Sequence, residues 1–310
     1  MSKHPRIAVI GSTGQVARAL VARAAARDIA LEARGRPDLD ITSRASIDEF
    51  LGASSPDIVV NAAAYTAVDK AESDATAAFA VNAAGSANIA AACAAAGVPL
   101  VHISTDYVFD GSGHTPYVET DATAPLGVYG RSKAEGERLV RAALPRHVIL
   151  RTSWVYGARG ANFLLTMLRL AGERDEVRVV ADQHGAPTLA DDLADAIIDI
   201  APRLVEAEDA SDLWGTWHVT GSGATTWHDF AAVIFAEAAR AGMRTPRLVA
   251  IGTADYPTPA RRPAYSVLDT TRAKATLGIV MPAWQDGVRR TLAEIARQRS
   301  RTAQHEGADA

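Results

Sequence analysis

Several features are scarce in this chain of 310 residues. Cysteine occurs once, as Cys93 within a run of alanines, so no disulfide framework can form within the chain and a buried, inert thiol is expected. The formal net charge of −4 and the pI near 6.1 exclude the basic footprint that binds nucleic acid or an anionic membrane. No apolar run reaches about 18 residues, so we expect neither an export signal nor a membrane span, and a reducing cytoplasm fits.

The sequence also lacks histidine and cysteine patterns typical of metal sites, and it contains few lysines. The eight histidines show no ligand spacing and the sequence has no Cys/His cluster, so no metal site is expected from these residues. Only four of the 32 Lys and Arg residues are lysine: Lys3, Lys70, Lys133 and Lys274. The arginine guanidinium is planar and almost never deprotonated, so it does not replace the compact ammonium of a lysine beside a catalytic group. A lysine next to another reactive side chain therefore carries weight here.

A glycine pattern follows the first strand candidate. The apolar run 6–10 leads directly into Gly11-Ser12-Thr13-Gly14-Gln15-Val16 and then into helical sequence up to Arg27. Gly11 suits the tight turn, Gly14 lets backbone N–H groups approach a pyrophosphate, and the helix N-terminus supplies partial positive charge. The order strand, glycine turn, helix predicts a dinucleotide-binding loop.

The second strand candidate, 29–33, bears on the choice of cofactor. Glu32 lies 21 positions after Gly11, the spacing at which a carboxylate binds the adenosine ribose of NAD. Arg34 and Arg36 follow at once and suit the 2′-phosphate of NADP. A solvated loop of mixed charge explains either arginine equally well. The choice between NADH and NADPH stays open.

A third strand, 56–61, ends in Ala62-Ala63-Ala64-Tyr65-Thr66. Small side chains at the carboxyl end of a strand leave room for a cofactor along the sheet. A close helix contact explains the same alanines equally well. A long helix is expected over 74–96, with Gly97 as its C-cap.

The strongest catalytic pattern combines a hydroxyl, a phenol and an ammonium. Thr105 follows closely after the buried run 100–103. Its hydroxyl is therefore expected at the carboxyl end of a strand, where ligands bind in open α/β sheets. Tyr129 and Lys133 are spaced i, i+4 on the next helix, 129–143, and therefore share one face. A cation within a few ångströms favours the phenolate, so we expect Lys133 to lower the pKa of Tyr129 and to fit it for acid catalysis.

Alternating strands and helices predict a Rossmann-like, doubly wound parallel sheet. We expect an NAD(P)-binding domain over residues 1–157 and a smaller α/β substrate lobe over 158–299 that exchanges elements with the first. The loop 110–127 is a candidate binding loop, and the proline-rich segment 256–263 is expected to face solvent or ligand. A closing helix is expected from Trp284 to about Arg297, followed by a disordered tail, 300–310.

The chain resembles the extended short-chain dehydrogenases/reductases, and among them the dTDP-4-dehydrorhamnose reductase family, over about residues 6–297. Beyond the glycine loop and Tyr129-Gly130-Arg131-Ser132-Lys133, the resemblance rests on the following segments: Val60–Glu72, Ser104–Phe109, Arg151–Tyr156, Asp182–Thr188, Thr225–Asp229, Arg262-Pro263 and Leu268-Asp269. It implies reduction of the C4 ketone of a dTDP-linked 4-dehydro-6-deoxy sugar with NADPH or NADH, for cell-surface polysaccharide synthesis.

The resemblance also implies roles for single residues. Tyr129 protonates the C4 oxygen, Lys133 lowers the pKa of that tyrosine and holds the nicotinamide ribose, and Thr105 hydrogen-bonds the reacting carbonyl. Thr105, Asp106 and Trp154 face the sugar. The implied cofactor residues are Gly11, Thr13, Gly14, Gln15, Val16, Glu32, Asp40, Ile41, Ala62, Ala63, Ala64, Tyr65, Thr66, Tyr129 and Lys133.

One departure from the family concerns metal and assembly. Some members form Mg²⁺-bridged dimers through acidic residues, one of them in the helix after the glycine loop, where this chain reads Arg18-Ala19-Leu20. Asp191 and Glu294 remain as carboxylates, and a carboxylate-poor site holds a hard cation weakly. Mg²⁺ is therefore doubtful here, and both a monomer and a homodimer stay open.

Two other functions stay open alongside the reductase. A nucleotide-sugar 4-epimerase on the same scaffold would keep a tightly bound NAD⁺ and return the hydride. A non-catalytic dinucleotide-binding regulatory subunit, of the kind found with methionine adenosyltransferase, would bind the cofactor without turnover. The later segments of the chain favour the reductase, and the intact Thr105, Tyr129 and Lys133 argue against the regulatory subunit.

Overall fold

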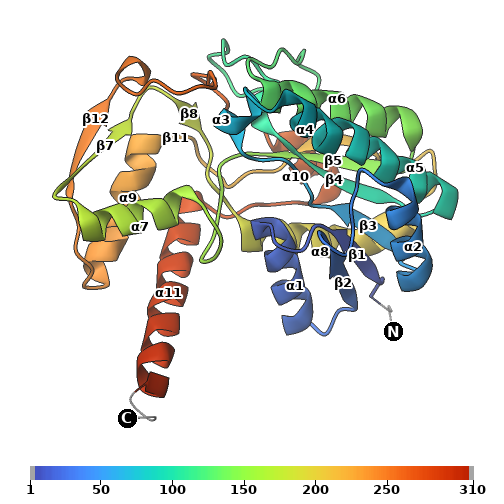
Figure 1. Cartoon of the computed structure of the whole chain (residues 1–310), viewed down its shortest axis with the longest axis horizontal. Helices are drawn as coiled ribbons and strands as arrows, with labels where there is room; N and C mark the ends of the chain where they lie inside the picture. Colours follow the sequence, from blue (N-terminus) through green and yellow to red (C-terminus); the bar gives the residue numbers. More distant parts are fainter. Residues whose placement is uncertain (1–3, 307–310) are drawn as a thin grey trace.

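The computed structural model describes residues 4–306, with side chains through residue 298. Its centre is a six-stranded sheet, and every neighbouring pair of strands in it is parallel. In spatial order the strands are β2 (Leu31–Arg34), β1 (Ile7–Ile10), β3 (Ile58–Asn61), β4 (Leu100–Thr105), β5 (His147–Thr152) and β10 (Gly215–His218). Helices cover both faces of this sheet (Figure 1), which confirms the Rossmann-like α/β fold predicted from the alternating pattern.

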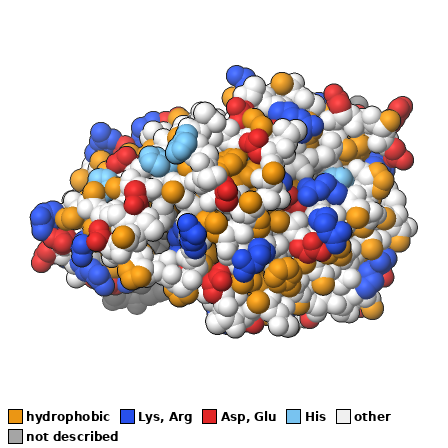
Figure 2. Space-filling model, turned by 90° about the horizontal axis from the view of Figure 1, so that it is seen from above, with side chains coloured by type: hydrophobic (Ala, Val, Ile, Leu, Met, Phe, Trp, Pro, Cys, Tyr) orange, Lys and Arg blue, Asp and Glu red, His pale blue; other side chains and the backbone are white. Residues whose placement is uncertain are grey.

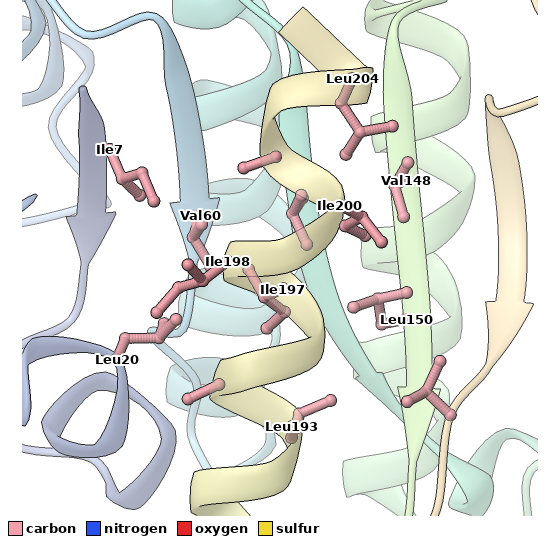
Figure 3. Packing of buried hydrophobic residues seen from close by; sticks show 14 of the residues in the cluster. Ile7, Leu20, Val60, Val148, Leu150, Leu193, Ile197, Ile198, Ile200 and Leu204 are labelled. Atoms are coloured by element: carbon pink, nitrogen blue, oxygen red, sulfur yellow. The ribbon is translucent and has the colours of Figure 1, made fainter. Parts of the chain in front are cut away.

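Helices cover both faces of the sheet, and its central strands β1 and β3 are fully buried and mostly apolar. In β1 the alternating side chains divide between two cores: Ile7 and Val9 join one, and Ala8 and Ile10 join the other. Figure 3 shows the first core, in which α8 lays Leu193, Ile197 and Leu204 against the strands. The helices of that face are α1 (Gln15–Ala26), α8 (Ala190–Glu206) and α10 (Thr271–Leu277). The opposite face carries α2 (Arg44–Ser54), α5 (Ser86–Ala96) and α6 (Val128–Ala143).

The helix expected over 74–96 is continuous but not uniform. It comprises α4 (Ala75–Phe79), a π-helical segment η1 (Ala80–Gly85) and α5, and it ends at the left-handed Gly97 as expected. By length and composition alone Ala75–Ala96 is apolar enough to cross a membrane. More than half of that window is buried inside the fold, with α5 packed against α2 and α6, so it has the burial of a core helix.

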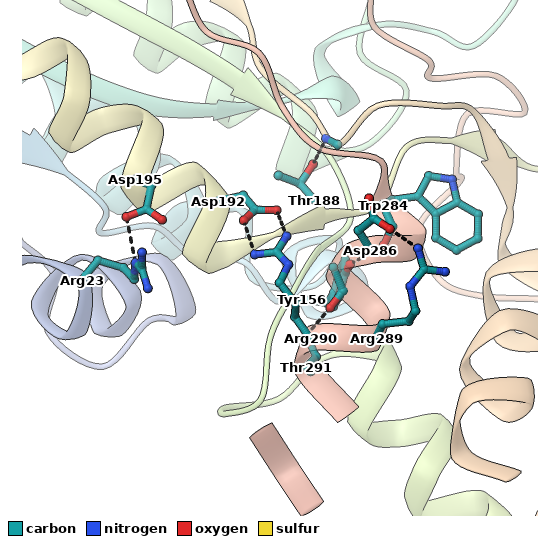
Figure 4. Close-up of polar contacts among 12 residues, drawn as sticks. Arg23, Tyr156, Thr188, Asp192, Asp195, Trp284, Asp286, Arg289, Arg290 and Thr291 are labelled. Atoms are coloured by element: carbon teal, nitrogen blue, oxygen red, sulfur yellow. Dashed lines mark hydrogen bonds and ion pairs between the residues drawn. The ribbon is translucent and has the colours of Figure 1, made fainter. Parts of the chain in front are cut away.

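A smaller set of elements packs beside the sheet. Its strands are β6 (Val155–Tyr156), β7 (Glu176–Val180), β8 (His184–Gly185), β9 (Thr188–Leu189), β11 (Thr225–Thr226) and β12 (Arg247–Ile251). Its helices are α7 (Phe163–Glu173), α9 (Trp227–Arg240) and α11 (Trp284–Glu306), which share one hydrophobic cluster. Figure 4 shows how α11 is tied to α8: Arg290 forms a bidentate ion pair with Asp192 at 2.7 and 2.6 Å.

The chain returns to the first lobe twice after residue 158. Strand β10 is the sixth strand of the main sheet, and α8 and α10 belong to its core. The predicted boundary between the two lobes at residue 157 stays a prediction. The three elements β10, α8 and α10 follow it in the sequence but pack in the first lobe. The expected end of the last helix near Arg297 is wrong, because α11 continues to Glu306. The disorder expected from residue 300 stays a prediction. Residues 307–310 lie outside the described part of the chain.

Short segments complete the two lobes. They are α3 (Val68–Ala71) and two 3₁₀ turns, η2 (Asp106–Val108) and η3 (Thr253–Asp255), the last in the second lobe. Figure 2 shows acidic and basic side chains interspersed over the face seen from above, as the near-balanced charge leads one to expect.

Candidate active site

A cavity of about 640 Å³ lies where the central strands end. Its wall includes residues that directly follow β1 and β3 and the last residues of β4 and β5, the edge at which open α/β sheets bind ligands. The predicted residues that line it are Gly11, Thr13, Gly14, Gln15, Val16, Ile41, Ala62, Ala63, Ala64, Thr66, Thr105, Asp106, Tyr129, Lys133 and Trp154.

The glycine loop has the geometry of an anion site. Gly11 has a φ of +104°, and a Cβ there would come within 2.9 Å of the Ala63 amide nitrogen, so the turn accepts only glycine. Gly14 is the N-cap of α1 and no side chain caps the helix, so its first amide groups stay available to a ligand. Gln15 ties the loop to the second lobe by donating to the Val155 carbonyl at 3.3 Å.

The structure brings Thr105, Tyr129 and Lys133 to one cavity. Thr105 ends β4, and Tyr129 is the second residue of α6, one turn before Lys133. The Thr105 hydroxyl lies close enough to the Tyr129 phenol to lower the pKa of that phenol. Lys133 is only 2% exposed, and its Nζ donates to the Ile103 carbonyl of β4 at 2.7 Å.

The electrostatics of the phenol differ from the expectation. Burial raises the pKa of Tyr129 to about 12, and the neighbouring Thr105 hydroxyl opposes that shift. Lys133 is not among the groups that shift the phenol, so its expected lowering of the Tyr129 pKa is wrong for this structure. Burial also lowers the pKa of Lys133 to about 8, and nearby Glu137 opposes that shift. Desolvation, which disfavours either charged form, outweighs the pairing that the sequence suggested.

Asp106 lies beside this group and is 2% exposed. Its Oδ1 accepts a hydrogen bond from the Thr105 hydroxyl at 3.0 Å, while its buried Oδ2 has no hydrogen-bond partner among the described residues. Burial raises the pKa of the Asp106 carboxyl to about 7. Asp106 Oδ2 can therefore accept a hydrogen bond from a hydroxyl group of a ligand at the cavity wall.

Trp154 forms a flat part of the cavity wall. It has a φ of +47°, which is strained for a bulky side chain, and its ring stacks on Trp227 with the centroids 3.6 Å apart. Gly185 leaves room for that ring, because a Cβ there would come within 2.5 Å of it. Strain held by packing in this way is typical of ligand sites.

Three predicted cofactor residues do not line the cavity. Glu32 pairs with Arg34 at 2.8 Å, Asp40 accepts from the Thr42 amide and hydroxyl, and the Tyr65 hydroxyl donates to Asp74 at 3.1 Å. Their part in cofactor binding stays a prediction.

Other lining residues were not predicted as site residues, among them Ser12, Gly35, Leu39, Val81, Ile103, Ser104, Thr152, Ser153, Val155, Gly160 and Ala161. Thr152 ends β5 as Thr105 ends β4, so the rule that found one could have found the other. Its buried hydroxyl has no partner among the described residues. Arg36, which the sequence offered only as an alternative, also lines the cavity. Gly160 and Ala161 come from a loop that carries no sequence signal.

Comparison with known proteins was made by sequence and by structure. The family model described as "RmlD substrate binding domain" matches residues 5–297. The chain is 48% identical to a dTDP-4-dehydrorhamnose reductase of Sinorhizobium fredii, covering 92% of this chain and 96% of the relative. It is 47% identical to the enzyme of that name from Escherichia coli K12, covering 83% and 85%.

Solved structures agree with the sequence comparison. A dTDP-4-dehydrorhamnose reductase from Clostridium acetobutylicum superposes with a TM-score of 0.86 at 36% identity, covering 94% of this chain and 99% of that one. The reductase from Bacillus anthracis in complex with NADP has a TM-score of 0.85 at 35% identity over the same shares. UDP-glucose 4-epimerase from Thermus thermophilus, at 21% identity and a TM-score of 0.77, shares the fold.

Proposed function

Since the chain belongs to the RmlD family of dTDP-4-dehydrorhamnose reductases, we propose that it reduces the C4 ketone of dTDP-4-dehydro-6-deoxy-L-mannose to dTDP-L-rhamnose with NADPH or NADH. It is an oxidoreductase of nucleotide-sugar metabolism. One observation carries the specific proposal: Thr105, Tyr129 and Lys133 lie on the wall of the cavity that the glycine loop also lines.

The residues present fit a dinucleotide. The uncapped N-terminus of α1 and the close approach of Gly11 to Ala63 leave backbone amides and open space where a pyrophosphate would lie. Ala62 and Ala64 add small side chains along the wall. When bound, the reduced nicotinamide supplies the hydride.

The chain's own groups would supply the proton. The raised pKa keeps the Tyr129 phenol protonated at neutral pH, the form that a proton donor to the C4 oxygen needs. The Thr105 hydroxyl, which lowers the pKa of the phenol, would stabilise the phenolate left behind by turning its proton from Asp106 to the phenolate oxygen. Lys133 would hold the nicotinamide ribose, with its ammonium fixed by the Ile103 carbonyl.

A bound Mg²⁺ does not fit the carboxylates of this chain. Asp191 on α8 and Glu294 on α11 are close enough for Glu294 to raise the pKa of Asp191. Glu294, however, lies 3.7 Å from Arg159, and Arg23 also faces Asp191. Mg²⁺ prefers carboxylate oxygens in an octahedral site, and here an arginine faces each of the two carboxylates and competes with a cation for their oxygens. No step of the reaction is assigned to a metal.

We also propose the cytoplasm as the site of action and the free nucleotide sugar as the partner, with a monomer or a homodimer as the assembly. A fully buried thiol whose pKa burial raises to about 12, Cys93, is compatible with a reducing compartment. Cell fractionation and light scattering test the compartment and the assembly.

The test is NAD(P)H oxidation in the presence of dTDP-4-dehydro-6-deoxy-L-mannose. We expect Tyr129→Phe to lower kcat about 10²-fold or more, since it removes the proton donor. Lys133→Ala should also lose activity, whereas Lys274→Ala, which removes an exposed lysine of α10, should not. Stoichiometric consumption of the cofactor distinguishes the reductase from an epimerase. Cofactor binding without any substrate-dependent loss of absorbance would indicate a regulatory subunit instead.

A further inference from the structure

Two carboxylates of the α3 segment, Asp69 and Glu72, lie outside the wall of the active-site cavity. Asp69 lies in α3 and Glu72 follows its end, spaced i, i+3 and therefore on neighbouring positions of one helical turn. Neither is among the residues of the cavity wall. Each hydrogen-bonds a segment far away in the sequence, and the two segments are different.

Glu72 holds the start of the catalytic helix. Its Oε1 accepts from the backbone amide of Val128 at 2.7 Å, and Val128 directly precedes Tyr129. The N-cap of α6 is Gly127, which has no side chain to cap the helix, so Glu72 supplies the missing acceptor from outside. A Cβ on Gly127 would lie 2.7 Å from that same oxygen, so the glycine leaves room for the contact.

Asp69 holds a loop of the second lobe. Its two oxygens accept from Arg262 at 3.1 and 2.8 Å, a bidentate pair, and Oδ1 also accepts from the Ala260 amide at 3.1 Å. Arg262 in turn donates to the Thr258 hydroxyl and the Ala260 carbonyl, which fixes the proline-rich loop 256–263. The Arg262 guanidinium also holds the pKa of Asp69 below its usual value, so the pair stays ionised at neutral pH.

The two held segments meet each other. The Arg261 carbonyl lies 3.9 Å from the position of a Cβ on Gly127, at the first turn of α6. The loop also lines a second cavity of about 620 Å³ together with the binding-loop residues Asp110 and Ser112. The α3 segment therefore touches both the helix that carries the phenol and a loop that borders an open ligand-sized space.

We propose that Asp69 and Glu72 are positioning residues, which fix the Tyr129 phenol and the 256–263 loop relative to one another and so align proton donor and sugar. Displacement of a catalytic group by about 1 Å costs about 10²-fold in rate, so an acceptor that fixes the residue next to Tyr129 acts on turnover. This inference rests on the proposed reductase function for its kinetic test, but its structural test does not.

The kinetic test separates the two carboxylates. Glu72→Ala should lower kcat about tenfold or more with KM for NADPH nearly unchanged, and Glu72→Gln, which keeps an oxygen acceptor, should restore most of it. Asp69→Ala should instead raise KM for the sugar nucleotide about tenfold, as should Arg262→Ala, because the loop is released. Lys70→Gln on the same helix is the matched control, since its side chain is 70% exposed and makes only a 3.9 Å pair with Asp74. Wild-type kcat in Glu72→Ala, or equal losses in Glu72→Ala and Glu72→Gln, would overturn the proposal.

Amide hydrogen exchange tests the hydrogen bonds of Glu72 and Asp69 without an enzyme activity assay. The Val128 amide should exchange faster in Glu72→Ala than in the wild type and stay protected in Glu72→Gln, while the Ala260 amide responds to Asp69→Ala alone. Unchanged exchange at both amides would refute the proposal whatever the enzyme turns over. Failure of the wild type to oxidise either NADPH or NADH with the sugar nucleotide would refute the proposed function, and the exchange rates would still decide the role of Asp69 and Glu72.

Discussion

The residue with the most unusual charge state is Asp106. The groups that face it are the Thr105 hydroxyl, the Tyr107 amide, Ser266 and the Tyr129 phenol, and none of them is a cation. The Ser266 and Thr105 hydroxyls and the Tyr107 amide lower the pKa of the carboxyl, but burial outweighs them and raises it to about 7. The carboxyl is therefore about half protonated at neutral pH, whereas an unfolded aspartate would be ionised.

This shift predicts a pH-dependent stability. Because the folded pKa is raised, the contribution of Asp106 is fully present below about pH 4, where both states hold the proton, and it is lost as pH rises to about 7. Asp106→Asn cannot ionise, so we expect the variant to gain about 2–4 kcal/mol relative to wild type between pH 4 and pH 8. Urea unfolding of both proteins across that range measures the difference. A constant gap between the two curves would show that the carboxyl titrates normally.

Arg36 is the residue that bears on the choice between cofactors. It lines the cavity with Gly35 and Ser12, whereas Glu32 is paired with Arg34 away from the wall. A guanidinium at that place suits a 2′-phosphate. We therefore expect Arg36→Ala to lower kcat/KM for NADPH about tenfold relative to NADH, the size of one charged hydrogen bond. Steady-state kinetics with both cofactors give the ratio, and an equal loss for both would assign Arg36 to general binding.

At the scale of elements, the contact between α6 and η1 determines how closely the helix that carries Tyr129 packs against its neighbour. The buried Asn82 of η1 accepts from the Tyr65 amide at 2.8 Å and donates to the Ser132 hydroxyl of α6 at 2.9 Å. Gly136, one turn further along α6, lies so close that a Cβ would overlap the Asn82 carbonyl. The π-helical turn thus joins the cofactor-side loop to the helix that carries Tyr129.

Gly136→Ala should push α6 away from η1. We expect a loss of about 1–3 kcal/mol in the free energy of unfolding, the usual cost of overpacking, together with reduced kcat. Gly52→Ala in α2 is the control, because nothing lies within 4 Å of its Cβ position, so it should gain about 0.5–1 kcal/mol from helix propensity. Chemical denaturation measures both, and equal effects at the two glycines would contradict the packing argument.

The elements themselves were largely readable from the sequence. Continuous apolar runs identified the strands, and local capping chemistry identified the helix end at Gly97. The position of Thr105 followed from the same logic, since it needed only a strand end and the rule for open sheets.

What the sequence did not predict depends on long-range packing. The π-helical turn at Asn82 arises from contacts with α6 and the Tyr65 backbone, which no local propensity encodes. The short α3 is too brief for a periodic signal, and β10 reads as a strand of either lobe until its pairing with β5 is known. The pKa of Tyr129 was predicted wrongly because pair spacing is visible in sequence and burial is not.

At the scale of the whole molecule, arginine–aspartate pairs connect α1, α8 and α11. Arg23 reaches Asp195 at 2.8 Å, and Arg290 holds Asp192, as Figure 4 shows. Asp192 is shielded, with a side-chain exposure of 11%, so this pair is worth more than an exposed one. The Arg290–Asp192 pair therefore joins the two lobes at this face, whereas the Arg23–Asp195 pair connects two helices of the first lobe.

This arrangement predicts indifference to chelators. Asp191 has a raised pKa because it is partly desolvated and faces Glu294, so its carboxylate is less available to a cation than an ordinary one. Glu294 is within 3.7 Å of Arg159 and accepts from Gln298, which leaves no oxygen cluster for a hard cation. We expect dialysis against EDTA, and the later return of Mg²⁺, to leave both kcat and the mass measured by light scattering unchanged. A drop in either on chelation, reversed by Mg²⁺ and abolished in Asp191→Asn, would mean that the two carboxylates recruit the remaining ligands from water or a second copy of the chain.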